Sequence, residues 1–283
     1  QAASDMRNPY TQQGDLAIER QLSSKMALTV NYIWSTGVQL FSNRDLNVGP
    51  TGADVTYRIN DASGNQVGSY TTPTYRLANR VDTRYRRVIQ VENGGRSYYN
   101  GLATQLKRKM SKGIEASIAY TWSHALDNVN MGGGNNTLFY DTLRSTANNS
   151  LSLDKGNSSL DQRHRFVVTS IFQPKFTNSG TAVARYLINN WQLSQITTKA
   201  SAPRTTTTVR IVGSPFTGAA FTGSLNGFGG SNRVPFEAFS NLKVDDFFRT
   251  DARLSKLLPI NEDVKIYVNF EAFNLFNHVT NTG

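Results

Sequence analysis

The chain has 283 residues, a hydrophobic fraction of 38% and a formal net charge of +10. It contains no cysteine, which excludes disulfides and thiolate metal sites, and its three histidines are too far apart for a histidine-based zinc site. No apolar run reaches the roughly 18 residues typical of a transmembrane helix, but a barrel can be this polar because only alternate strand residues meet lipid. Composition therefore leaves a soluble β protein and a membrane barrel open.

The first predicted element is a hairpin formed by residues 15–22 and 25–34 around Ser23 and Ser24. Apolar and polar side chains alternate along its second arm, where one face holds Met26, Leu28, Val30, Tyr32 and Trp34. Side chains alternate across a strand, so this pattern is typical of a sheet with one polar face. We therefore expect an all-β, antiparallel meander.

Residues 101–123 predict a second hairpin, with arms of about ten residues around a loop at 111–113. An ordinary strand has roughly 5–6 residues, whereas a tilted strand that spans a bilayer needs roughly 9–11. The length therefore favours transmembrane strands. The predicted lipid face includes Arg108, which lies beside the turn, where its long stem can carry the charge to the membrane surface.

Further strands are expected at 163–172, where both faces are mixed and the register stays open, and at 190–200, which we pair with 205–212. The last predicted hairpin joins 249–258 to 263–273 through residues 259–262. No segment of comparable length has helical periodicity. Between these hairpins lie three long, irregular stretches, 41–100, 127–161 and 213–246. Short turns that alternate with long loops are typical of barrels, with short turns in the periplasm and long loops outside.

Two sets of residues are candidates for defined positions in such a barrel. The candidate lumen-facing residues are Gln105, Lys107, Glu115, Thr121, Asn269 and Glu271. The candidate membrane-interface aromatics are Tyr32, Trp34, Tyr120, Trp122, Trp191 and Phe270, because amphipathic rings favour the boundary between hydrocarbon and water. The alternatives are a generic hydrated wall for the first set and an ordinary β core for the second.

Basic residues cluster at 83–87, 107–109 and 163–165. Such clusters are either solvated strand ends and loops or contacts with anionic lipid headgroups. Nucleic-acid binding is not favoured, because the cations are scattered rather than gathered in one aromatic groove. We also expect no enzyme, cofactor or metal site: Asp161 and His164 lack a nucleophile motif, and the glycine runs lack the lysine of a phosphate loop.

Several segments together resemble the TonB-dependent outer-membrane receptors, specifically their Oar-like branch, common in acidobacteria and other Gram-negative relatives. The matching segments are 7–22, 98–128, 154–166, 190–198 and 249–278. The resemblance implies a barrel of about 22 strands with a plugged lumen, energised through TonB. It also implies that large solutes such as iron chelates, oligosaccharides or peptides are bound.

The chain departs from that family plan in three ways. It shows no plug or TonB-contacting segment, it has about 8–12 strands, and it ends without a terminal aromatic strand. We therefore expect residues 1–283 to be one β-barrel segment of a bacterial outer-membrane receptor or transporter, with outer-membrane lipid as a partner and TonB only if a plug exists elsewhere. The alternative is a barrel-derived fragment that self-associates through open strand edges as a structural or cell-surface assembly.

Overall fold

The computed structural model describes residues 2–47, 49–128, 155–207, 209, 211–213, 225–227, 238, 240–261 and 263–280. The strands in this part are β1 Tyr10–Ser23, β2 Met26–Asp45, β3 Pro50–Asn60, β4 Gln66–Tyr75, β5 Ile89–Ser111, β6 Ile114–Asp127, β7 Gly156–Asn157, β8 His164–Phe172, β9 Trp191–Ala200, β10 Phe247–Pro259 and β11 Lys265–Ala272. A 3-10 helix at Leu77–Asn79 and a π-helix at Ala184–Ile188 complete these elements. Neither helix has the length and apolar character needed to cross a membrane.

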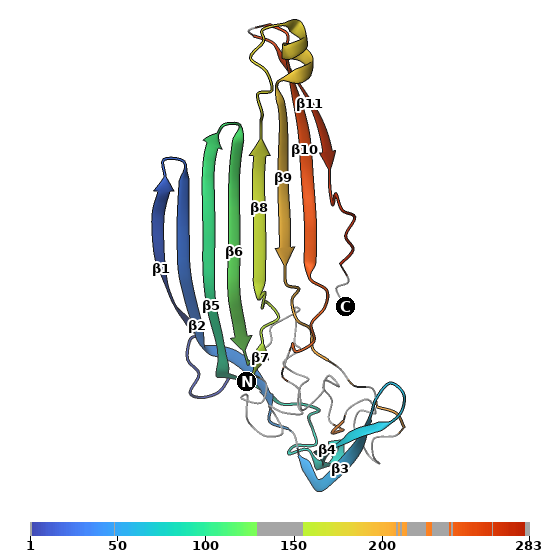
Figure 1. Ribbon diagram of the computed structural model, residues 1–283. Coiled ribbons are helices and arrows are strands. Elements are labelled where there is room, and N and C mark those ends of the chain that lie inside the picture. The colour runs from blue at the N-terminus through green and yellow to red at the C-terminus, as the bar shows by residue number, and fades with distance from the viewer. Residues whose placement is uncertain are drawn as a thin grey trace.

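One long sheet dominates the molecule (Figure 1). Its strands follow in the order β1-β2-β5-β6-β8-β9-β10-β11, every neighbouring pair is antiparallel, and the short β7 pairs with β6. This arrangement confirms the expected antiparallel meander of long strands. Among the described residues β1 and β11 are the edge strands, so the sheet does not close into a barrel.

The register confirms the predicted faces of the central hairpin. Leu106 stands opposite Ile118 and Leu102 opposite Trp122, so the apolar residues of β5 and β6 share one side. The turn is tighter than expected, because Ser111 pairs with Ile114 and only Lys112 and Gly113 remain between the strands. Both of these residues have positive φ, 51° and 75°, as a type I′ turn requires.

The two other predicted hairpins also form, with their turns displaced along the chain. In the first, Ser23 pairs with Met26, so the turn lies at residues 24–25 rather than 23–24. In the last, Pro259 pairs with Lys265, so residues 260–264 make the connection. The displacements follow from cross-strand pairing, which fixes the ends of a hairpin more tightly than sequence alternation does.

The prediction of an irregular stretch at 41–100 is wrong for most of its length. β2 continues to Asp45 and β5 begins at Ile89, so both strands extend into this stretch, and the β3–β4 hairpin lies between them. The β2–β5 register shifts between Val38 and Ser42. A bulge moves successive side chains to the other face, which interrupts the period-two pattern and conceals the rest of the strand.

The predicted pairing of 190–200 with 205–212 is also wrong. β9 has β8 on one side and β10 on the other, so no edge of β9 is left for a further strand. In 205–212 the described residues contain only an isolated bridge from Thr205 to Leu242. The run of threonines has high β propensity, but a segment forms a strand only where a neighbouring strand can pair with it.

The β8–β9 connection is longer than the other connections at its end of the sheet. Residues 173–190 lie at the end where the short turns are, and they contain the π-helix (Figure 1). Of the two other predicted long loops, residues 129–154 of 127–161 and most of 214–239 of 213–246 lie outside the described residues. We call the two ends of the sheet the turn end, with residues 24–25, 112–113 and 260–264, and the loop end.

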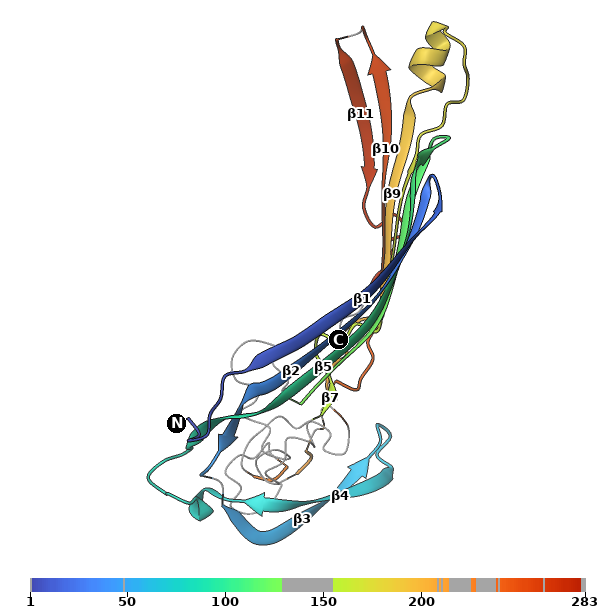
Figure 2. The same ribbon diagram turned by 90° about the vertical axis from the view of Figure 1, so that its left-hand side faces the viewer.

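The loop end carries a second folded region, the loop-end cap, which consists of residues 46–47, 49–88 and 225–227. The β3–β4 hairpin of this cap lies across the end of the long, twisted sheet (Figure 2). The Tyr57 hydroxyl donates to the Leu225 carbonyl at 2.6 Å, and the Tyr75 amide donates to the Asn226 carbonyl at 2.8 Å. Segments far apart in the sequence thus join in the cap.

Candidate functional site: a sheet with two unlike faces

The register extends the two faces of the hairpins across the whole sheet. Residues directly opposite each other in an antiparallel pair point to the same side. One such row, on the apolar face, runs Leu28, Leu106, Ile118, Val168. A row on the other side, the polar face, runs Lys107, Ser117, Thr169, Ile196, Asp251. The sheet therefore has one mainly apolar face and one mainly polar face.

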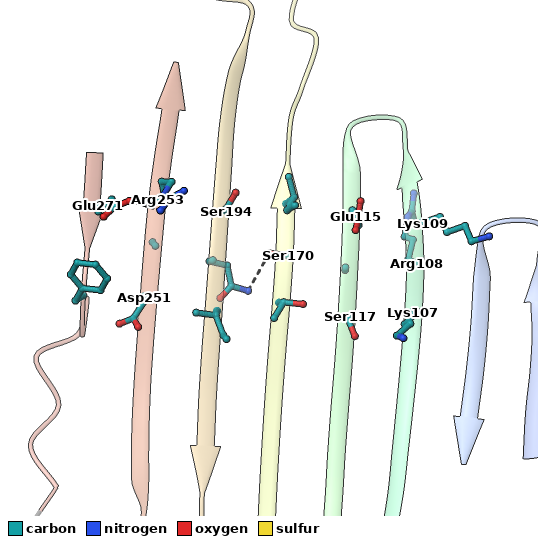
Figure 3. A pocket seen from close by; sticks show the side chains of 17 residues that line it. Lys107, Arg108, Lys109, Glu115, Ser117, Ser170, Ser194, Asp251, Arg253 and Glu271 are labelled. Carbon is teal, nitrogen blue, oxygen red and sulfur yellow. Dashed lines mark hydrogen bonds and ion pairs between the residues drawn. The ribbon is translucent and has the colours of Figure 1, made fainter. Parts of the chain in front are cut away.

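The polar face contains an open hollow of about 660 Å³ between β5 and β11 (Figure 3). Its charged lining residues from the polar face are Lys107, Lys109, Glu115, Asp251, Arg253 and Glu271. Arg253 and Glu271, which stand opposite each other, form an ion pair at 2.5 Å, and Arg249 Nε donates to Asp251 at 2.8 Å. The surface thus presents fixed charges of both signs.

The structure brings the six candidate lumen-facing residues onto this one face. Lys107, Glu115 and Glu271 line the hollow itself. Gln105, Thr121 and Asn269 lie on the same face outside it, as their cross-strand partners show. The Gln105 side chain also donates to the Ser117 hydroxyl at 3.2 Å across β5 and β6.

Carboxylates are segregated between the two faces. Along the main sheet, from the turn end to the β2–β5 bulge, every acidic strand residue stands on the polar face: Asp15, Glu19, Glu115, Asp127, Asp251 and Glu271. The apolar face of the same strands holds no acidic residue. It does hold basic residues, and these are concentrated toward the strand ends: Arg20, Arg96, Arg108, Lys199 and Lys256. Alternation of apolar and polar residues does not by itself require that acidic residues be absent from the apolar face while basic residues are present there.

The candidate interface aromatics all lie on the apolar face, in two groups. Tyr32, Trp34, Tyr120 and Trp122 lie toward the loop end, whereas Trp191 and Phe270 lie nearer the turn end. In the first group Tyr32 donates to Asn100 Oδ1 at 2.8 Å, and its ring stacks on that of Trp34 with centroids 6.2 Å apart. Each group therefore combines apolar rings with polar atoms at one end of the strands.

The turn end has a second hollow that the sequence did not predict. It has a volume of about 510 Å³ and is lined entirely by apolar or amphipathic residues: Phe172, Pro174, Phe176, Ile188, Trp191, Leu193 and Leu254. Beside it, the Lys256 ammonium lies 4.9 Å from the centre of the Trp191 ring and donates to the Asn189 carbonyl. In the sequence, the closely spaced Pro174 and Phe176 were the only sign of an apolar cluster here. Residues 173–190 have no regular periodicity from which their fold could be predicted.

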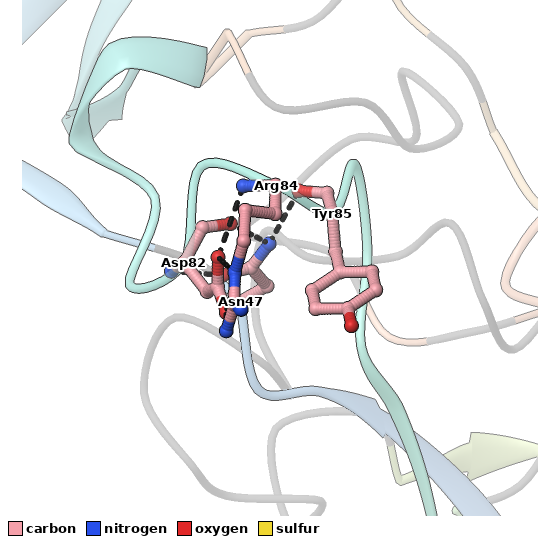
Figure 4. A network of polar contacts seen from close by, with 4 residues as sticks. All are labelled: Asn47, Asp82, Arg84 and Tyr85. Carbon is pink, nitrogen blue, oxygen red and sulfur yellow. Dashed lines mark hydrogen bonds and ion pairs between the residues drawn. The ribbon is translucent and has the colours of Figure 1, made fainter.

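Polar contacts hold the arginine-rich segment 80–88 inside the cap (Figure 4). The Asn47 side chain, 1% exposed, donates to the carbonyls of Asp82 and Tyr85 at 2.9 and 2.7 Å and accepts the Asp82 amide at 2.7 Å. The Arg84 guanidinium, hydrogen-bonded to Asp82 at 2.7 Å, holds the pKa of that carboxyl below its ordinary value. A side chain distant in sequence therefore fixes this basic segment.

The described residues contain no group of three or more His, Asp or Glu side chains that could hold a metal ion. The Tyr120 hydroxyl and His164 Nδ1 are 2.8 Å apart, which uses one of the ring nitrogens of His164. Asp161 is 1% exposed, and its carboxylate accepts the Ala125 amide at 2.7 Å. These two residues, noted together in the sequence, thus serve separate local contacts.

One family of known proteins matches the sequence over nearly its whole length, and a solved structure is similar to it in part. The outer membrane transporter YddB from Escherichia coli has a solved structure that matches 98% of this chain at 11% identity, with a TM-score of 0.47. This chain spans only 30% of the length of that transporter. No curated protein matches the sequence. The profile of a family described as "Outer membrane beta barrel domain" matches residues 1–282. The chain therefore belongs to the outer membrane β-barrel domain family, and its place is the bacterial outer membrane.

Proposed function

We propose that this chain forms part of the wall of a non-enzymatic outer-membrane receptor or transporter of the TonB-dependent type. The polar face lines a conduit for a large solute, and the apolar face meets lipid. The observation that carries this proposal is the segregation of side chains, because carboxylates and the charged hollow are on one face and the large apolar residues on the other. TonB dependence rests on the resemblance of the sequence segments.

The dimensions of the apolar face support this orientation. From Ile114 to Trp122 the strand rises about 26 Å, or roughly 20 Å along the axis of a barrel whose strands tilt by about 40°. The apolar band of outer-membrane barrels is roughly 25 Å tall and is bordered by aromatic rings on both sides. The turn end then faces the periplasm and the loop-end cap faces the cell exterior.

The charges of the hollow indicate the class of solute. Arg253 forms an ion pair with Glu271, and Arg249 forms one with Asp251. Lys107 and Glu115 add charges of opposite sign to the same surface (Figure 3). A surface with donors and acceptors of both signs suits a polar solute with several hydrogen-bonding groups better than an apolar one. Oligosaccharides, peptides and iron chelates are the candidates that the family resemblance adds.

The face assignment can be tested with the three tryptophans of the chain. Trp34→Phe with Trp191→Phe leaves Trp122 as the reporter, and Trp34→Phe with Trp122→Phe leaves Trp191. We expect both reporters to be quenched strongly by lipids brominated near the headgroup. The control is Thr121→Trp in a background with all three tryptophans replaced, which should respond to aqueous acrylamide and not to brominated lipid. Equal lipid quenching at positions 121 and 122 would overturn the assignment.

Self-association through strand edges is the second candidate function. β1 and β11 each pair on one side only within the described residues, and unpaired edges are templates for other chains. This alternative predicts a soluble, concentration-dependent assembly in sedimentation experiments without detergent. A band that shifts on heating in detergent gels would favour a closed barrel instead.

A further inference from the structure

We propose that the loop end of the apolar face holds a specific site for a phosphate-bearing lipid headgroup, formed by Tyr120, His164 and Lys199. This inference rests on the proposed function, in which the apolar face meets lipid. It adds to that function a defined headgroup site and the charge that the headgroup must carry.

Three neighbouring strands bring the site together. Tyr120 on β6 stands opposite Phe166 on β8, and Phe166 stands opposite Lys199 on β9, so all three side chains point to the apolar side. His164 follows on the same face of β8, opposite Trp122. A cation and an imidazole therefore stand beside three aromatic rings.

The imidazole is held in place by the strand beside it. The Tyr120 hydroxyl and His164 Nδ1 are 2.8 Å apart, and the two rings stack with centroids 6.2 Å apart and an interplanar angle of 16°. His164 is exposed, so its Nε2 can meet a group arriving from the membrane surface. When Tyr120 donates to Nδ1, the neutral ring carries its proton on Nε2 and can donate it to a phosphate oxygen.

The electrostatics of this region select an anion. Lys199 is exposed and has no ion-pair partner among the described residues. Between the turn end and the β2–β5 bulge, no acidic strand residue stands on this face. Farther along the same face lie Arg96, opposite Val38, and the Lys155 ammonium, 5.6 Å from the centre of the Tyr98 ring. The positive surface thus continues beyond the aromatic residues toward the cap.

A lipid headgroup is the anion that fits this combination. Aromatic rings beside the cations place the bound charge at the boundary with hydrocarbon, where a lipid phosphate stands and a free solute does not. Two of the basic residues at the turn end are less suited to the role, because their side chains are engaged within the protein. Lys256 is 5% exposed and its ammonium donates to the Asn189 carbonyl, and the Arg108 guanidinium donates to the Ser111 carbonyl.

The test uses the full chain in phosphatidylcholine bilayers with Trp122 as the single fluorescent reporter. A brominated lipid that ends in a phosphate monoester is titrated into the bilayer, and quenching gives its binding relative to brominated phosphatidylcholine. We expect Lys199→Gln to weaken the relative binding about fivefold, which corresponds to roughly 1 kcal/mol per basic residue near an anionic surface. Lys199→Arg should keep most of the binding.

Arg165→Gln is the matched control, because it removes one positive charge at the same end of β8 but on the polar face, opposite Thr121. It should leave the relative binding unchanged. Equal losses in K199Q and R165Q would overturn the site, since they would show a response to net charge alone. Competition by inorganic phosphate in the buffer would also overturn it, because the site would then take the free anion. Should K199Q fail to refold, His164→Asn in the same titration must weaken binding for the proposal to stand.

The two proposals fail in different ways. If the apolar face does not meet lipid, brominated phosphatidylcholine will not quench Trp122 in any variant. If only the headgroup site is wrong, both brominated lipids will quench Trp122 equally, and K199Q will behave as the parent does.

Discussion

The long sheet and the loop-end cap place their side chains in opposite ways. In the sheet, large apolar side chains are exposed: Leu16 is 67% and Phe270 61% accessible. In the cap, polar side chains are buried: Asn47 is 1% and Thr72 2% accessible. The cap follows the ordinary rule of proteins folded in water, in which buried polar groups have partners. The sheet instead exposes large apolar side chains on one face, which is the arrangement that the proposed contact with lipid requires.

The hydrogen bonds show the same contrast. The long strands satisfy their backbone groups through continuous ladders with their neighbours, which hydrocarbon requires because it offers no partner of its own. The cap uses side chains to satisfy its backbone: Asp61 accepts the amides of Ser63 and Asn65, each at 2.9 Å. Such local Asx turns are typical of loops in water.

The largest effect should come from a charge placed in the middle of the apolar face. Ile118→Arg should destabilise the chain in lipid vesicles by about 2–4 kcal/mol if position 118 lies at the bilayer midplane. Glu115→Lys, on the polar face of the same strand, should be nearly neutral. Denaturant titrations of vesicle-inserted protein measure both, and equal tolerance of the two changes would remove the distinction between the faces.

The sheet and the cap can also be compared through one glycine in a turn of each region. Gly113 in the sheet and Gly64 in the cap have positive φ, 75° and 89°, which costs a side-chain-bearing residue about 1–2 kcal/mol. A Cβ on Gly113 would also lie 2.4 Å from the Gln173 carbonyl oxygen, whereas one on Gly64 meets nothing within 4 Å. We therefore expect Gly113→Ala to lower the free energy of unfolding more than Gly64→Ala. Equal costs would mean that the β8 end moves away freely.

A smaller, local effect is expected from Asn47→Ala. The change removes three hydrogen bonds and leaves the carbonyls of Asp82 and Tyr85 without this partner, at a cost of about 1–3 kcal/mol to the cap. Trypsin should then cleave the arginine-rich segment 80–88 faster, while the sheet stays protected in vesicles. Asn79→Ala, at an exposed position directly before this segment, is the control. Unchanged cleavage in N47A would show that Asn47 does not hold the segment.

The smallest effect is the response of the cap to acid. Because Arg84 lowers the pKa of Asp82 in the folded state, the stabilisation from this contact is complete above the ordinary value of 3.8 and is lost as the pH falls through the lowered pKa. NMR signals of Tyr85 should report this loosening below the ordinary pKa. Asp82→Asn should show no such pH dependence at this contact. A transition above pH 3.8 would contradict the direction of the shift.

The sequence predicted well those features that depend on neighbouring residues. The three hairpins and the faces of β2, β5 and β6 follow from alternation, and they were confirmed with turns displaced by only a few residues. The candidate lumen residues came to lie on one face for the same reason. Their contact with a solute, and the contact of the aromatics with lipid, remain predictions.

Features that depend on distant partners were missed. The Tyr57–Leu225 contact joins residues 168 positions apart, so no local sequence pattern predicts the cap. Likewise, 205–212 has strand-like composition but no free sheet edge beside β9. The register of β8, whose two faces look alike in sequence, became defined only through its neighbours β6 and β9.

By itself, the sequence determined that this protein is built from long antiparallel strands with one apolar and one polar face, because side-chain direction alternates locally along a strand. Only the tertiary structure decided how far those strands extend and which strands pair. It also placed every carboxylate of the main strands between the turn end and the β2–β5 bulge on the polar face, and it held residues 80–88 on Asn47. These outcomes depend on cross-strand register and on contacts between remote segments, and neither is encoded in the local alternation of side chains.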